Sequence, residues 1–227
     1  LAVPAGFDDR TFQTSDGVRL HYLEGGNRRA QARTIVFVPG WTMPARIWSP
    51  QLHYFASDYR VIALDPRSQG DSQIAKSGHE HGRRGGDIAE LIEHLRRSGQ
   101  EESVVLAGWS LGVLDSLAYV AAYGDRRVAS LVLVDNSVGE EPPPVIRFNL
   151  VAALRKDRET TVRNFVRGMY AQAADAAYLE EVSRLALRTP LGPAIELLSY
   201  PVPREYWRNA IYSTERPVLY AVTSRFA

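Results

Sequence analysis

A serine framed by two glycines is the strongest chemical signal in the sequence. The segment Gly108-Trp109-Ser110-Leu111-Gly112 lies between an expected strand and an expected helix. In so tight a turn, side chains two positions before and after the serine would collide, which explains the two glycines, and the serine hydroxyl is held exposed. The helix dipole and the N–H of Leu111 can then stabilise negative charge on a substrate oxygen. The alternative interpretation is an ordinary glycine-rich turn between a strand and a helix.

Two further polar turns follow earlier strands. Val38-Pro39-Gly40-Trp41 ends one strand, and its glycine lets the backbone turn so that the N–H of Trp41 faces the serine as a second donor to an oxyanion. By itself this is a common strand-to-loop turn, so its weight comes from its position. The loop Asp65-Pro66-Arg67-Ser68-Gln69-Gly70-Asp71-Ser72 follows the next strand. Its Asp, Arg and Ser side chains predict structural support for the site rather than a part in the chemistry.

The elements around these motifs alternate between strand-like and helix-like stretches. This alternation is typical of a mostly parallel sheet with helices on both faces. The expected strands cover residues 11–14, 18–23, 33–38, 59–64, 104–107, 129–134 and 217–222, and the expected helices cover 46–55, 87–97 and 111–122. The first two strands form a hairpin, because Asp-Gly in the intervening turn supplies a positive φ at little cost.

The sequence changes character after Asp135. A stiff Glu-Glu-Pro-Pro-Pro linker at 140–144 precedes helical pieces from Val145 to about Tyr212, which are interrupted by prolines. Strand-like sequence resumes at Pro217. We therefore expect a core domain at residues 1–139, a helical cap insertion at 140–214, and a core strand resuming at 215–227.

These features together resemble the α/β-hydrolase superfamily over essentially the whole chain. The hairpin, the Gly40 turn, the 65–72 loop, the Gly-x-Ser-x-Gly segment and the helical insertion occur in the order of that family, and the serine segment looks especially like those of lid-bearing carboxylesterases. The resemblance implies an α/β fold with a mostly parallel twisted sheet, helices on both faces and an inserted helical cap. It also implies a serine hydrolase that forms an acyl-enzyme. Ser110 matches the nucleophile, and Trp41 and Leu111 match the oxyanion-hole positions.

The acid of the family's triad has one candidate. Many members carry it after the strand that follows the cap, where this chain reads Val222-Thr223-Ser224-Arg225-Phe226-Ala227 without a carboxylate. Other members, including haloalkane dehalogenases, carry it after the strand that precedes the cap, and Asp135 matches that position. The family's order of serine, acid and histidine fits this assignment. The alternative is that Asp135 only forms a turn with Asn136 and Ser137.

The base of the triad has no candidate by chain order. The resemblance implies a histidine after the last strand, whereas all five histidines, His21, His53, His79, His81 and His94, precede Ser110. Without a proton acceptor a serine hydroxyl is a poor nucleophile at neutral pH. We therefore expect the 227 residues to be an incomplete record of a protein that also contains the last strand, the last helix and the base.

Composition excludes several other classes. A formal net charge of +1 argues against nucleic-acid binding, and the longest apolar run, Leu117 to Tyr123, is too short to span a membrane. The absence of cysteine excludes thiolate metal sites. His79 and His81 form a loop without the spacing that places two ligands on one helical face, so we expect no metal and no cofactor. Asp115, on the helix after Ser110, is expected to be solvated.

The functional hypothesis is a serine hydrolase that cleaves a carboxylic ester or a related acyl substrate. A cap implies a partly enclosed, apolar pocket, and hence an apolar small-molecule substrate. The alternative is a non-catalytic ligand-binding or scaffold protein on the same fold. Val3-Pro4-Ala5 has the small residues of a signal-peptidase site, which leaves both an exported or periplasmic and a cytoplasmic location open. No feature of the sequence indicates the oligomeric state.

Overall fold

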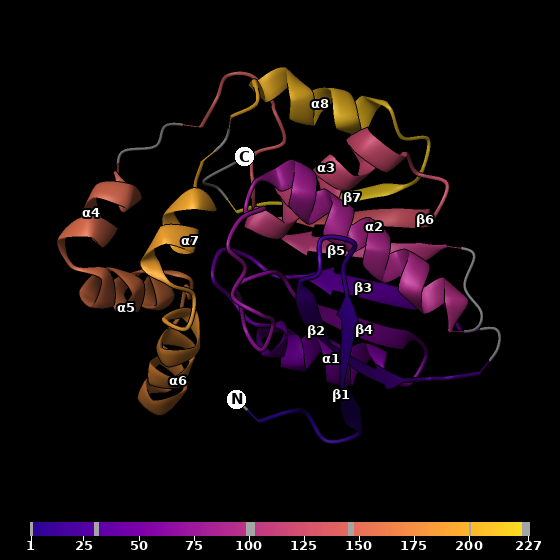
Figure 1. The fold of residues 1–227 in the computed structure, drawn as a ribbon, viewed down its shortest axis with the longest axis horizontal. Helices are drawn as coiled ribbons and strands as arrows, with labels where there is room; N and C mark the ends of the chain where they lie inside the picture. The colour runs from indigo at the N-terminus through magenta and orange to yellow at the C-terminus, as the bar shows by residue number, and fades with distance from the viewer. Residues whose placement is uncertain (1, 30–31, 99–102, 145–147, 200, 224–227) are drawn as a thin grey trace.

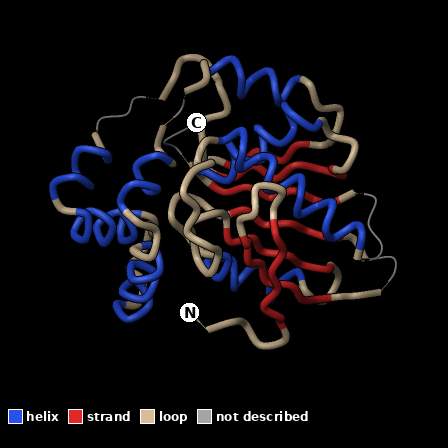
Figure 2. The backbone as a smooth tube through the Cα atoms, viewed as in Figure 1, coloured by secondary structure: helices blue, strands red, loops and turns tan. Residues whose placement is uncertain are grey.

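The computed structural model describes residues 2–29, 32–98, 103–144, 148–199 and 201–223, and its sheet lies between layers of helices (Figures 1 and 2). The elements are, in chain order, β1 (Phe7–Gln13), β2 (Arg19–Gly26), β3 (Thr34–Val38), η1 (Ala45–Trp48, a 3-10 turn), α1 (Ser49–Phe55), β4 (Arg60–Asp65), α2 (His81–Arg97), β5 (Val104–Trp109), α3 (Leu111–Tyr123), β6 (Val128–Val134), α4 (Leu150–Lys156), α5 (Arg158–Gly168), α6 (Ala176–Ala186), α7 (Leu191–Glu196), α8 (Arg204–Tyr212) and β7 (Val218–Ala221).

The seven strands form one sheet in the order β1-β2-β4-β3-β5-β6-β7. Strand β1 pairs antiparallel with β2, and β2 pairs antiparallel with β4, whereas the remaining pairs are parallel. The predicted opening hairpin is confirmed: Gly17 has a φ of +83°, and the hydroxyl of Thr14 accepts a hydrogen bond from the Val18 N–H at 3.0 Å. The expected α/β fold class is likewise confirmed.

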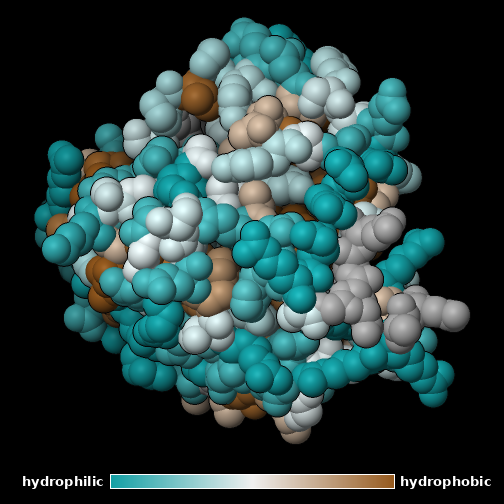
Figure 3. Space-filling view, turned by 45° about the vertical axis from the view of Figure 1, so that its right-hand side comes forward, coloured by the Kyte–Doolittle hydropathy of each residue, from teal (hydrophilic) through white to brown (hydrophobic). Residues whose placement is uncertain are grey.

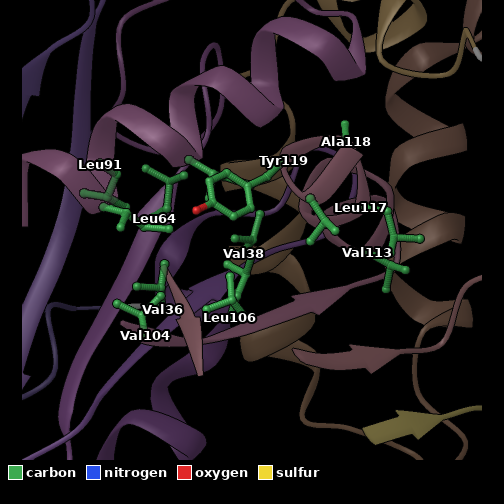
Figure 4. Packing of buried hydrophobic residues seen from close by; sticks show 14 of the residues in the cluster. Val36, Val38, Leu64, Leu91, Val104, Leu106, Val113, Leu117, Ala118 and Tyr119 are labelled. Carbon is green, nitrogen blue, oxygen red and sulfur yellow. The ribbon is translucent and has the colours of Figure 1, made fainter. Parts of the chain in front are cut away.

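The central strands are apolar on both faces, as a sheet covered on both sides requires. On β3, Val36 and Val38 point into the cluster formed with α2 and α3, which Figure 4 shows at close range. The alternate residues Ile35 and Phe37 point to the other face, where Trp48 and its neighbours in η1 and α1 cover them. This alternation follows from the period of two along a strand. Because each face of β3 has its own apolar cover, the register of the strand in the sheet is fixed.

Helix α2 begins earlier than the sequence predicted. The expected start was Asp87, but the helix begins at His81, so that the expected loop at His79 to Gly82 runs into the helix. The early turns contain Gly82, Gly85 and Gly86, and because glycine is a poor helix former, local propensity does not indicate a helix there. Gly85 is needed there because a Cβ atom would lie 2.7 Å from the Tyr119 backbone nitrogen and 2.9 Å from the Ala118 carbonyl carbon. Gly85 therefore permits the close packing of α2 on α3.

Helices α4 to α8 lie between β6 and β7, and the described residues from 148 to 212 contain no strand. They do not all pack in one place. Helices α4 to α7, here called the four-helix group, stand beside the sheet, whereas α8 lies against α3 (Figure 1). Trp207 and Ala210 of α8 belong to the main apolar cluster with α2 and α3. The division into a core at 1–139, a cap at 140–214 and a resuming core strand at 215–227 stays a prediction.

The surface is polar over most of the face shown in Figure 3, with apolar residues in small separate groups. Strand β7 is an exception to the general burial of the sheet, because Val218, Leu219 and Tyr220 are exposed. Within the described ranges, no helix has both the length and the hydropathy that crossing a membrane requires.

Candidate functional site

Three loops meet at the carboxyl edge of the parallel strands. Val38 of β3 pairs with Gly108 of β5, and Trp109 of β5 pairs with Val134 of β6. In the sequence, Ser110 and Asp135 come directly after two of these paired residues, and Gly40 comes two positions after Val38. Because the carboxyl ends of parallel strands form one edge, the register brings together the segments that the sequence singled out. Ligands bind at this edge in open α/β sheets.

Ser110 occupies a strained turn between β5 and α3. Its backbone has φ 53° and ψ −119°, a conformation that non-glycine residues rarely adopt. A Cβ atom on Gly108 would lie 2.3 Å from the Gly112 carbonyl oxygen, and one on Gly112 would lie 2.3 Å from the Val38 carbonyl oxygen. Both glycines are therefore required, the second because of β3 rather than because of the turn itself. The strain holds the serine side chain away from the helix that it precedes.

The two residues expected to supply backbone N–H groups to the site are Leu111, which follows Ser110 directly, and Trp41, which follows Gly40. Leu111 is the first residue of α3, so its N–H has no acceptor within the helix. The N–H groups of Leu111 and Trp41 donate no hydrogen bond to another described residue. Gly40, directly before Trp41, packs against the serine: a Cβ atom there would lie 3.1 Å from the Ser110 Cβ and 3.5 Å from its Oγ. Trp41 and Leu111 are buried at 3% and 2% relative exposure.

Asp135 is half-buried at the end of β6, with a φ of 57°. Its Oδ1 accepts hydrogen bonds from the Thr223 N–H at 3.1 Å and the Thr223 hydroxyl at 2.7 Å, so it binds the segment that follows β7. The neighbouring Asn136 makes a local side-chain bond, because its Oδ1 accepts from the Ser137 N–H at 2.8 Å. The Asn136 amide also donates to the Ser110 carbonyl oxygen at 2.8 Å. Residues 224–227 lie outside the described residues.

The histidines are engaged elsewhere, and none of them hydrogen-bonds to Ser110 in the part of the chain that the structure describes. The His21 ring bonds to Asp65 at 2.7 Å and to Asp9 at 2.8 Å. Burial lowers the pKa of His21, but its bonds to these carboxylates outweigh burial and raise the pKa above its ordinary value. Asp9, His21 and Asp71 lie close enough to share a cation. However, both His21 nitrogens are already bonded, and Asp71 pairs with Arg46 at 2.7 Å.

Asp115 is not solvated, contrary to the sequence prediction. It lies on the face of α3 that turns toward α2, with a relative exposure of 1%. The Arg84 guanidinium binds both of its oxygens, at distances from 2.6 to 3.0 Å, and the His81 ring binds Oδ1 at 3.0 Å. Burial raises the pKa of Asp115, yet the Arg84 charge and the two partners' hydrogen bonds hold it below its ordinary value. An ion pair thus joins α2 and α3 in the core.

The 65–72 loop supports the Gly40 turn through two side chains, in line with the structural role that the sequence predicted. The Asp65 carboxylate accepts from the Ala45 N–H at 2.5 Å. The Gln69 amide donates to the Gly40 carbonyl oxygen at 3.0 Å and to the Met43 carbonyl oxygen at 2.8 Å. Gly70 permits this compact loop, because a Cβ atom there would lie 1.9 Å from the Asp65 Oδ1.

Sequence reasoning did not assign a supporting role at the site to four residues: Gln69, Arg84, Asp115 and Asn136. Only Asp115 carried a usable signal, since it is the one charged residue in the otherwise apolar or uncharged helix Leu111–Tyr123. A lone charge on an apolar helix implies a buried partner. Gln69 and Asn136 stand among other polar residues, so no pattern distinguishes them.

The four-helix group covers the Trp41 side of the site. The Trp41 indole donates to the Ala194 carbonyl oxygen of α7 at 2.7 Å and meets the Phe165 ring of α5 edge-on at 4.9 Å. Trp41, Met43 and Leu111 share an apolar cluster with residues of these helices and with Leu197, which follows α7: Leu154, Val162, Val166, Val182, Ala186 and Ala194. The surroundings of the two backbone donors are therefore apolar on this side.

Comparison with known proteins gives the same fold. Residues 33–223 match the family model described as alpha/beta hydrolase fold. A non-heme chloroperoxidase of Streptomyces lividans is 38% identical over 125 residues, covering 55% of this chain and 43% of the relative. A bifunctional esterase/perhydrolase of Acinetobacter calcoaceticus is 34% identical over 122 residues, covering 53% of this chain and 42% of the relative. The matched stretch thus spans less than half the length of each of these relatives.

A solved structure extends the likeness to nearly all of the chain. The crystal structure of a proposed aryl esterase from Burkholderia cenocepacia superposes with a TM-score of 0.81 at 25% sequence identity. The superposition covers 94% of this chain and 78% of that one. The arrangement of the sheet and the helices is thus shared along the described residues.

Proposed function

Since this chain belongs to the alpha/beta hydrolase fold family, we propose that it acts as a serine hydrolase on a carboxylic ester or a related acyl substrate. Ser110 is the nucleophile, the N–H groups of Trp41 and Leu111 form the oxyanion hole, and Asp135 is the acid of the triad. The observation that carries this proposal is the backbone of Ser110, which holds a strained conformation between two obligatory glycines at the carboxyl edge of the sheet.

The proposed reaction proceeds in two steps. The Ser110 Oγ attacks the acyl carbon, its proton passes to a general base, and the leaving alcohol takes that proton as the acyl–oxygen bond breaks. Water then gives a proton to the base and attacks the acyl carbon; the bond between this carbon and the Ser110 Oγ breaks, the carboxylic acid leaves, and the base returns the proton to Oγ. In both steps the acyl oxygen gains negative charge, and the Trp41 and Leu111 N–H groups stabilise it. The base is the histidine that the family resemblance implies, held in orientation by Asp135.

The cover over the site supports an apolar acyl group. The Trp41 and Phe165 rings and the aliphatic residues of the four-helix group pack together on the side of the oxyanion donors. Apolar surface of this kind favours the binding of hydrocarbon rather than charged acyl chains. The relatives named as an esterase/perhydrolase and as a proposed aryl esterase agree with acyl chemistry.

The test of the nucleophile uses a fluorophosphonate probe and a set of p-nitrophenyl esters with the intact protein. We expect labelling of Ser110, and a loss of about 10⁴-fold or more in kcat for Ser110→Ala. The control is Ser130→Ala, a serine of the neighbouring strand β6, which keeps its activity. If the wild-type protein neither reacts with the probe nor hydrolyses any ester, the alternative of a non-catalytic binding protein is correct.

The acid is tested by Asp135→Asn. Asparagine keeps an oxygen that can accept from the Thr223 N–H and hydroxyl, so the local structure is preserved while the charge is lost. If Asp135 orients the base, kcat falls by about 10⁴-fold. A variant with wild-type kcat would remove Asp135 from the triad and leave Ser110 unaffected as the nucleophile.

A further inference from the structure

The peptide group between Gly40 and Trp41 has two functional ends. Its N–H belongs to Trp41 and is the proposed oxyanion donor, and its carbonyl oxygen belongs to Gly40. The peptide is planar and trans, so the carbonyl and the N–H point in opposite directions. Whatever fixes the direction of the Gly40 carbonyl therefore also fixes the direction of the Trp41 N–H.

The Gly40 carbonyl oxygen accepts two hydrogen bonds. The Gln69 Nε2 donates to it at 3.0 Å, and the Met43 N–H donates to it at 3.2 Å. Rotation of the peptide by half a turn would break both bonds and place the carbonyl oxygen where the N–H was. Such a rotation changes ψ of Gly40 and φ of Trp41 together, and glycine accepts a wide range of backbone angles at the first of these positions. A Cβ atom at position 40 would make a tight contact with the serine, 3.1 Å from the Ser110 Cβ.

The orientation of the Gln69 amide is itself enforced. Gln69 is completely buried, and its Oε1 accepts from the Arg84 Nη1 at 3.2 Å. A guanidinium can only donate, so Oε1 must face Arg84 and Nε2 must face the Gly40 and Met43 carbonyls. Arg84 is in turn held by two-point pairing with Asp115 on α3. The same helix presents the other donor, the Leu111 N–H, at its first residue.

We propose that Gln69, oriented by the buried Arg84–Asp115 pair, is a positioning residue that locks the Gly40–Trp41 peptide with its N–H toward the acyl oxygen. This inference rests on the proposed function. Asp115, Arg84 and Gln69 form a continuous chain of buried hydrogen bonds from α3 to the Gly40 turn. The chain ties the two oxyanion donors to one rigid support, so that neither needs to reorganise when negative charge develops.

Gln69→Glu is the decisive variant. The introduced carboxylate keeps the size of the side chain and still accepts from Arg84, but it presents an oxygen to the Gly40 and Met43 carbonyls. A rotated peptide, with the Trp41 N–H donating to that oxygen, then becomes the favoured arrangement. We expect kcat for p-nitrophenyl ester hydrolysis to fall by about 100-fold, as for removal of one oxyanion donor, while KM changes by less than about threefold.

Two further variants separate positioning from stability. Gln69→Met removes the donor without adding an acceptor, and we expect kcat to fall by about 10-fold, a part of the loss on removal of an oxyanion donor. Ser72→Ala is the matched control: Ser72 lies in the same loop, and its hydroxyl also makes two buried bonds to backbone, with the His21 N–H and the Asp65 carbonyl, rather than with the Gly40 turn. It should lower the midpoint of urea unfolding comparably and leave kcat within about twofold.

Crystal structures of the wild type and of Gln69→Glu decide the proposal independently of activity. A rotated Gly40–Trp41 peptide in the variant supports it, and an unrotated peptide overturns it. A kcat that falls no further in Gln69→Met than in Ser72→Ala also overturns it. If the peptide rotates but the wild-type protein shows no hydrolysis that depends on Ser110, the positioning role stands and the proposed function fails.

Discussion

Ion pairs within the sheet and its covering helices, here called the core, differ in solvent exposure from ion pairs that join the core to the four-helix group. In the core, the Arg84 and Asp115 side chains pair at 1% exposure each, and the Arg67 guanidinium pairs with Asp87 at 0% and 2%. Between the core and the four-helix group, His79 pairs with Glu196 at 2.6 Å, but Glu196 is 57% exposed. Arg188, in the connection between α6 and α7, pairs with Asp71, and these side chains are 45% and 30% exposed. Arg–Asp pairs are therefore shielded from water in the core and partly exposed to water at the contact with the four-helix group.

The difference in exposure implies that the two sets of ion pairs contribute differently to stability. A buried pair is strongly destabilising to break, because the remaining charge is left without water, whereas an exposed pair contributes little. The donors of the proposed oxyanion hole are therefore anchored to the rigid region. Trp41 and Leu111 also pack against the four-helix group in a buried apolar cluster. Only the charged part of the contact between the two regions is therefore expected to break at small cost.

The largest effect is expected from Arg84→Met, which removes the guanidinium that pairs with the buried Asp115 and leaves the His81 ring as its remaining described partner. We expect a loss of about 3–5 kcal/mol in the free energy of unfolding, measured by urea denaturation. The double variant Arg84→Met/Asp115→Leu removes both charges and should recover most of that loss. If the single variant lost less than about 1 kcal/mol, comparable with an exposed pair, the contrast between the two regions would disappear.

A smaller effect is expected from Gly85→Ala, which tests the close packing of α2 on α3. The added methyl would lie 2.7 Å from the Tyr119 backbone nitrogen, so the helices must separate, at a cost of about 1–3 kcal/mol. Gly82→Ala in the first turn of the same helix is the matched control, since a Cβ atom there has nothing within 4 Å. The control should be neutral or stabilising. Equal thermal unfolding midpoints for the two variants would show that this packing is not tight.

Trp41→Phe tests the direct link between the regions. The variant loses the indole hydrogen bond to the Ala194 carbonyl but keeps a ring beside Phe165. We expect a loss of about 1 kcal/mol in the unfolding free energy, and faster native-state proteolysis within 150–196. Tyr54→Phe, an exposed aromatic residue of α1, serves as the control. Unchanged proteolysis would mean that the indole does not hold α7 to the core.

The smallest effect is expected from Glu196→Gln, which weakens the contact with His79. Because Glu196 is more than half exposed, we expect the unfolding free energy to fall by less than about 1 kcal/mol. Glu159→Gln, which weakens an exposed pair with Arg163 inside the four-helix group, gives the reference value for a surface contact. A loss from Glu196→Gln several times larger than that reference would place this contact with the buried pairs of the core.

The fold was largely predictable because strand and helix periods are local properties of the chain. The β-branched runs at β3 to β6 and the Asp-Gly turn specified their elements directly. The start of α2 was not predictable, since local propensity disfavours its glycines and only the approach of α3 explains Gly85. Asp115 was misjudged for the same reason. Its partner lies 31 residues away in the sequence, on the neighbouring helix.

The sequence by itself determined the order of the elements and the strained turn at Ser110, because glycines at two fixed positions and a strand-to-helix junction are local requirements. It did not determine how the other parts of the site face that serine. The strand register decided that Gly40, Ser110 and Asp135 meet at one edge. Burial decided that Gln69, Arg84 and Asp115 form one chain of hydrogen bonds. Such contacts depend on which distant side chains share a water-free space, and only tertiary packing creates that space.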